Sequence, residues 1–125
     1  MITNEEVLLI HSEVLKLHGG SNGTRDINRL ESAIARPYQT FDGKDLYPSC
    51  YEKAAAIGES IIINHPFIDG NKRTGYVLME IILRINGYKI TALDENLYSF
   101  IIKISTGEIH YDEIVEWLKN NTKAL

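Results

Sequence analysis

The apolar run from Tyr76 to Ile85 limits the possible folds more than any other stretch of this sequence. Eight of its ten residues are apolar, so a helix over this stretch is apolar on nearly every side. Such a helix is stable in water only when other elements surround it. The run therefore predicts a central buried helix. Asn86-Gly87 ends it, because such a pair favours a helix terminus.

Further segments show the spacing of apolar residues that is expected of helices. Their predicted limits follow capping boxes, an Asp N-cap, a terminal Gly, or a Pro just beyond the end. The segments run from Thr3 to Gly19, from Asp26 to Arg36, from Ser49 to Asn64, from Asp94 to Thr106 and from about Tyr111 to Asn120. Strand-type alternation is hard to find, so the sequence predicts an all-α fold, a compact bundle of about six helices.

The length of 125 residues predicts one domain over residues 1–125, without repeats or linkers. A formal net charge of −4 gives no overall positive field, so no direct nucleic acid binding is expected. No apolar run approaches the roughly 18 residues of a membrane span, and no signal peptide pattern opens the chain. With Cys50 as the single cysteine, these features predict a cytoplasmic protein.

The longest predicted loop runs from residue 37 to residue 48. Within it, an Asp-Gly pair between aromatic residues is typical of a type I′ hairpin turn. We expect a small exposed flap, and a plain connection is the alternative. A hairpin beside an active site can pair its edge with an extended peptide. The flap residues are Thr40, Phe41, Asp42, Gly43 and Lys44.

The chemistry of the chain is concentrated between the third predicted helix and the central one, in the sequence HPFIDGNKRTG that begins at His65. Pro66 disfavours helical backbone at His65, so one helix ends near Asn64 and the next begins at Asn71. A helix N-terminus presents unpaired N–H groups and a partial positive charge. Gly70 allows the entering loop a positive φ or close contact with a ligand. This geometry favours phosphate binding.

Lys72 and Arg73 occupy a helix turn that usually contains Asp or Glu. Two exposed cations at the positive end of the helix dipole are unfavourable by about 0.3–1 kcal/mol each. A highly charged anion, such as a nucleoside triphosphate, would remove the conflict. Arg73 can bind phosphate oxygens as a fork, and Lys72 as a point charge.

Asp69, His65 and Asn71 supply the remaining groups of the predicted site. A carboxylate beside phosphates is the usual protein ligand of Mg²⁺. His65 is the only nearby group that titrates near neutral pH, so it could take a proton from an attacking hydroxyl. Asn71 could donate a hydrogen bond to a phosphate oxygen. Together these residues predict phosphoryl or nucleotidyl transfer.

Each of these residues alone also has an ordinary explanation as a helix end, a turn or a solvated charge, so the hypothesis depends on their combination. Zinc fits poorly, because His65 and Asp69 have no further His or Cys at ligand spacing. The other histidines are interpreted as structural or surface residues: His11, His18 and His110.

The sequence from His65 to Arg73 resembles the Fic-family motif, His-Pro-Phe-x-Asp/Glu-Gly-Asn-Gly/Lys-Arg. The stretches at residues 25–26, 30–33 and 36–37, together with Thr-Gly-Glu-Ile at 106–109, are similar to the Doc (death-on-curing) branch. The resemblance covers nearly the whole chain. It implies a nucleotide-dependent transferase with ATP as substrate nucleotide and Mg²⁺ as cofactor.

The resemblance also implies roles for individual residues. His65 would be the general base, and Lys72 and Arg73 would join it in catalysis. Asp69 would hold Mg²⁺, and the flap would align the target. The phosphates would be bound by Gly70, Asn71, Lys72 and Arg73.

Two positions favour the Doc branch over the adenylylating Fic enzymes. Lys72 stands where those enzymes usually have glycine, and Tyr76 where they have a second arginine. The Doc branch implies transfer of the γ-phosphoryl group to a Thr or Ser of elongation factor Tu, which blocks translation, and a Phd-like antitoxin partner. AMP transfer to a protein and a non-catalytic binding module are the alternatives. Residues 91–96 also look like a self-inhibitory Fic motif, but we discount this match, because the same residues suit a helix start capped by Asp94 and six loosely defined positions match easily by chance.

Overall fold

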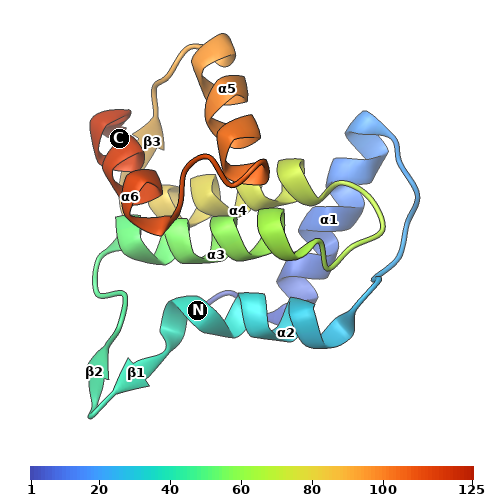
Figure 1. The fold of residues 1–125 in the computed structure, drawn as a ribbon, viewed down its shortest axis with the longest axis horizontal. Helices are drawn as coiled ribbons and strands as arrows, with labels where there is room; N and C mark the ends of the chain where they lie inside the picture. The colour runs from blue at the N-terminus through green and yellow to red at the C-terminus, as the bar shows by residue number, and fades with distance from the viewer.

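The computed structural model describes all residues 1–125 and consists mainly of six α-helices (Figure 1). The helices are α1 (Asn4–His18), α2 (Ile27–Ala35), α3 (Cys50–Asn64), α4 (Asn71–Ile85), α5 (Asp94–Ser105) and α6 (Tyr111–Asn120), with a short 3₁₀ helix, η1 (Arg36–Tyr38), after α2. β1 (Thr40–Phe41) pairs antiparallel with β2 (Lys44–Asp45), and β3 (Tyr88–Ile90) with β4 (Thr122–Ala124). The predicted all-α class is confirmed. No helix is long and apolar enough to span a membrane.

The centre of the fold is the pair α3 and α4, which lie side by side in Figure 1 with the other helices around them. Two glycines let these helices approach closely. A Cβ on Gly58 would lie 2.4 Å from the Sδ atom of Met79, and a Cβ on Gly75 would lie 2.6 Å from Cγ1 of Ile62. The predicted central helix is confirmed, although its last residue, Ile85, is 73% exposed.

The helix starts that depend on local capping agree with the sequence. Thr3 and Ser49 both form capping boxes, and the side chain of Asp26 accepts a hydrogen bond from the N–H of Arg29. The start of α5 differs, because Leu93 is the N-cap and Asp94 is the first helical residue. The predicted cap by Asp94 is therefore wrong.

Two further details differ from expectation. Arg36 keeps helical backbone angles (φ −52°, ψ −47°) although Pro37 follows it, because the chain continues into a 3₁₀ turn. The pairing of β3 with β4 was not anticipated. These strands have three residues each and lie about 30 positions apart in the sequence, so no local alternation pattern marks them.

Candidate active site

The loop between α3 and α4 contains two residues with left-handed backbone. His65, directly after α3, has φ +48° and ψ +57°, and Gly70, directly before α4, has φ +78°. A neighbouring segment holds the loop in place: the N–H groups of Arg25 and Asp26 donate to the carbonyl of Pro66 at 2.7 and 3.1 Å. The predicted end of α3 near Asn64, the predicted start of α4 at Asn71 and the positive φ allowed at Gly70 are confirmed.

Asn71 closes the loop from inside. Its Oδ1 accepts a hydrogen bond from the N–H of Phe67, and its Nδ2 donates to the carbonyl of Phe67, both at 3.0 Å. The residue is only 9% exposed. The side chain thus fixes the shape of the loop. The backbone N–H of Asn71, in the first turn of α4, has no partner within the helix.

His11 supports the same loop from α1. Its ring stacks on Phe67 with centroids 3.7 Å apart, and both side chains are buried. The Nε2 atom of His11 lies 2.8 Å from the carbonyl oxygen of Asp69, so Nε2 carries the proton and donates. The interpretation of His11 as a structural residue fits this position.

The loop and the start of α4 form one wall of a cleft of about 880 Å³. The opposite wall comes from α5 and is mostly apolar. The cleft is lined by His18, His65, Ile68, Asp69, Gly70, Asn71, Lys72, Arg73, Tyr76, Asp94, Leu97, Tyr98, Ile101 and Ile102. All predicted residues of the motif therefore meet at one cavity.

The pKa of His65 is lowered below its ordinary value. Partial burial contributes most, because it disfavours the charged imidazolium, and the positive charges of Arg25, Lys72 and Arg29 add to the effect. The lowered pKa favours the neutral imidazole, whose unprotonated ring nitrogen can accept a proton. That is the state which a general base requires.

The positive charge at the start of α4 is not balanced within the first turn of the helix. Its first turn contains no acidic residue, and neither Lys72 nor Arg73 forms an ion pair within the chain. Both side chains are exposed, and the N–H groups of the first turn have no partner within the helix. The arrangement can bind an anion with two cations and several backbone donors.

Asp69 has one carboxylate oxygen engaged and one available. Oδ2 accepts a hydrogen bond from the N–H of Ser21 at 2.8 Å, while Oδ1 has no partner within the chain. The chain contains no group of three or more potential metal ligands. A single carboxylate with a free oxygen fits Mg²⁺, which usually combines one or two protein carboxylates with substrate phosphates and water.

Tyr76 lies in the cleft one turn after Arg73. Its hydroxyl donates to Oε2 of Glu80 at 2.6 Å. Burial, together with this hydrogen bond and the negative charge of Glu80, raises the pKa of Tyr76. Tyr76 thus places a neutral, hydrogen-bonded phenol where the adenylylating Fic enzymes usually have a second arginine, so this position adds no further positive charge to the cleft.

The flap is a separate feature. Asp42 and Gly43 both have positive φ, 53° and 76°, which confirms the predicted type I′ hairpin. However, the hairpin precedes α3 while His65 follows it, so the two lie at opposite ends of this helix (Figure 1). With 15 residues, α3 is about 22 Å long. The structure does not bring the flap together with the motif residues.

Several residues of the cleft were not expected there. The interpretation of His18 as a structural or surface residue did not anticipate its place in the cleft, and the sequence assigned no role in the site to Leu97 and Ile101. The local sequence contains no signal for these roles. They depend on how α1 and α5 pack around the start of α4.

The fold and the cleft together define a helical protein in which a histidine and a positively charged helix start share one site. A comparison with protein families matches residues 1–83 to the Fic/DOC family. The chain therefore belongs to the Fic/Doc family.

Two relatives are named for the Doc branch. Toxin Doc of Mycolicibacterium smegmatis is 43% identical over 74 residues, which are 59% of this chain and 57% of the relative. The match thus spans little more than half the length of that protein. Protein kinase doc of Escherichia phage P1 is 27% identical over 118 residues, 94% of this chain and 92% of the relative.

Proposed function

We propose that the protein is a Doc-like toxin kinase that transfers the γ-phosphoryl group of ATP to a Thr or Ser hydroxyl of a translation factor such as elongation factor Tu. The modification would block translation in the cytoplasm. The observation that supports this function most is that His65, whose pKa is lowered, shares one cleft with the positively charged start of α4. The names of the two relatives support the same class of activity.

In this mechanism the phosphates of ATP lie against the N–H groups of the first turn of α4, where Lys72 and Arg73 neutralise their charge. Asp69 would hold Mg²⁺, which when bound neutralises charge on the phosphate oxygens. His65 accepts the proton of the target hydroxyl as its oxygen bonds to the γ-phosphorus. The bond from that phosphorus to the bridging oxygen breaks, and ADP leaves.

Lys72 and Tyr76 favour phosphoryl over adenylyl transfer. Lys72 adds a side chain and a charge where AMP-transferring relatives usually have glycine. Tyr76 is hydrogen-bonded to Glu80 at the position of their second arginine, so it cannot take over the role of that cation. AMP transfer remains the rival activity, and it would give a much heavier adduct.

The proposal includes a Phd-like antitoxin as partner. The relative named Toxin Doc supports a toxin role. The apolar wall of the cleft contains an exposed aromatic side chain, Tyr98, which is 71% exposed. An antitoxin segment that is disordered alone and folds on binding would suit regulation by antitoxin degradation.

The test incubates the purified protein with elongation factor Tu, ATP and Mg²⁺ and measures the intact mass of the factor. We expect an adduct of one phosphoryl group, which His65→Ala abolishes. The matched control is His110→Ala, which removes a histidine that is 70% exposed at the start of α6 and should leave the adduct unchanged. An adenylyl adduct, no adduct at all, or full activity of His65→Ala would overturn the proposal.

A further inference from the structure

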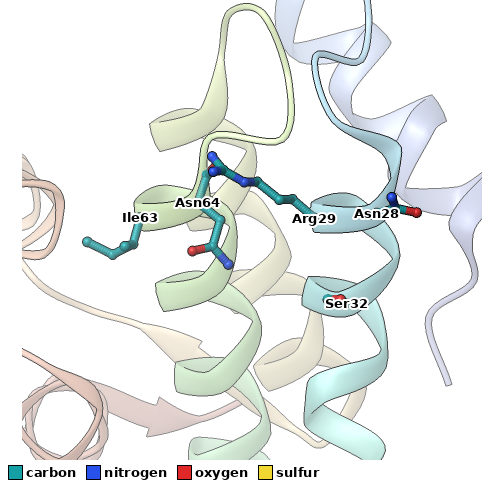
Figure 2. Close-up of a pocket in the computed structure, with 5 residues that line it drawn as sticks. All are labelled: Asn28, Arg29, Ser32, Ile63 and Asn64. Carbon is teal, nitrogen blue, oxygen red and sulfur yellow. The ribbon is translucent and has the colours of Figure 1, made fainter.

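A second depression, of about 470 Å³, lies between α2 and the C-terminal end of α3. Figure 2 shows the residues that line it: Asn28, Arg29, Ser32, Ile63 and Asn64. The side chain of Arg29 reaches from α2 toward the backbone of Asn64, the last residue of α3. No residue is shared with the cleft of the active site, so the depression is a separate feature of the surface.

The depression is rich in polar groups that the protein itself does not use. The side chains of Asn28, Ser32 and Asn64 take part in no hydrogen bond within the chain. Arg29 donates through Nη1 to the carbonyl of Asn64 at 3.1 Å, and its Nε lies 3.4 Å from an exposed carboxylate oxygen of Asp26. Its Nη2 is free. A ligand with acidic or polar side chains could therefore bind here without displacing internal hydrogen bonds.

The depression adjoins His65. Asn64 directly precedes His65 in the chain, and Arg29 is close enough that its charge contributes to the lowered pKa of the imidazole. In phosphoryl transfer the attacking and leaving oxygens lie roughly in line on opposite sides of the phosphorus. With the nucleotide in the cleft, the target hydroxyl has to reach His65 from another side. Arg29 and Asn64 flank such an approach.

We infer that this depression is the subsite that binds the protein substrate next to its accepting Ser or Thr, with Arg29 pairing with an acidic side chain of the target. The inference rests on the proposed function and adds the substrate determinant to it. Helices α2 and α3 also extend from the flap to the loop between α3 and α4 (Figure 1). At about 3.3 Å per residue, some seven extended residues would span the roughly 22 Å length of α3.

The first test fills the depression. Ser32→Trp places a large side chain at an exposed position of α2, and Ser99→Trp makes the same change at an exposed position of α5, outside both sites. Phosphorylation of elongation factor Tu is measured at varied factor and varied ATP. We expect Ser32→Trp to raise the KM for the factor at least about fivefold and to change the KM for ATP less than about twofold. Ser99→Trp should resemble the wild type.

The second test concerns charge. Arg29→Ala should raise the KM for the factor about fivefold, since one exposed ion pair contributes up to about this factor. Arg29→Lys keeps the positive charge, so its KM for the factor should lie close to that of the wild type. A purely structural role of Arg29 at the end of α3 would instead lower thermal stability and affect the KM for both substrates.

The outcomes separate the two hypotheses. If the wild type phosphorylates the factor and Ser32→Trp or Arg29→Ala does so with unchanged KM, the subsite is wrong and the kinase activity stands. If the wild type transfers no phosphoryl group to the factor, the proposed function fails, and the subsite fails with it.

Discussion

At the scale of single residues, His65 combines a left-handed backbone with a lowered pKa. A residue with a Cβ adopts this conformation at a cost of about 1–2 kcal/mol, so the surrounding structure has to hold it there. The hydrogen bonds from the N–H groups of Arg25 and Asp26 to the carbonyl of Pro66 do so. Pro66 made the end of α3 predictable. The left-handed conformation of His65 could not be predicted from the sequence, because it depends on contacts with residues about 40 positions earlier in the chain.

The lowered pKa of His65 predicts how activity depends on pH. The imidazole is a base only when neutral, so transfer should decline as the pH falls through its pKa and be constant above it. Arg25→Gln removes one of the charges that lower this pKa. The acid limb of kcat/KM against pH should therefore move to higher pH. The backbone hydrogen bond from residue 25 to Pro66 is retained, because only the side chain changes.

The control for this measurement is Lys119→Gln, which removes an exposed cation from α6 that does not contribute to the pKa shift of His65. Its pH profile should coincide with that of the wild type. An acid limb that stays in place in Arg25→Gln would show that His65 is not the titrating base.

At the scale of elements, the start of α4 departs from the charge pattern that stabilises helix N-termini. Lys72 and Arg73 are exposed, unpaired and adjacent to the positive end of the helix dipole. Other helices of this protein follow the usual pattern, with Glu5 and Glu6 in the first turn of α1 and Lys103 in the last turn of α5. Local rules of this kind are expected to fail at functional sites.

Lys72→Gln should therefore stabilise the nucleotide-free protein while weakening its activity. We expect a gain of about 0.3–1 kcal/mol in the free energy of unfolding, measured by urea denaturation at low salt. Lys103→Gln is the matched control, since the same change at the favourable end of a helix should lower stability slightly. Equal losses in both variants would contradict the electrostatic explanation of this helix start.

The elements and motif positions that could be predicted from the sequence depend on neighbouring residues in the chain. Capping boxes at Thr3 and Ser49 and the type I′ turn at Asp42 involve residues at most three apart. The pairing of β3 with β4 and the apolar wall that α5 adds to the cleft depend on distant contacts. The half of the cleft formed by the loop and the start of α4 was accordingly predictable, and the half formed by α5 was not.

At the scale of the whole molecule, Arg36 joins elements that are far apart in the sequence. From the end of α2, its Nη1 donates to Glu59 at 2.9 Å and to Ser60 at 3.0 Å, both on α3. Its Nε donates to the hydroxyl of Tyr47 at 3.0 Å, and the guanidinium lies 5.6 Å from the ring of Tyr111 on α6. One side chain thus connects the end of α2 with α3 and α6.

Arg36→Ala should lower the free energy of unfolding by about 2 kcal/mol, because hydrogen bonds to charged groups contribute about 1.5–3 kcal/mol and Glu59 would be left without its main partner. Arg36→Lys should lower the free energy of unfolding by a smaller amount, since lysine keeps the charge but lacks the planar guanidinium that donates several hydrogen bonds at once. Arg84→Ala is the control, because its pair with Glu80 is longer, at 3.7 Å, and more exposed, and it should lose less than about 1 kcal/mol. Urea denaturation of the three variants measures the differences. Equal losses in Arg36→Ala and Arg84→Ala would mean that Arg36 acts as an ordinary surface charge and does not connect the helices.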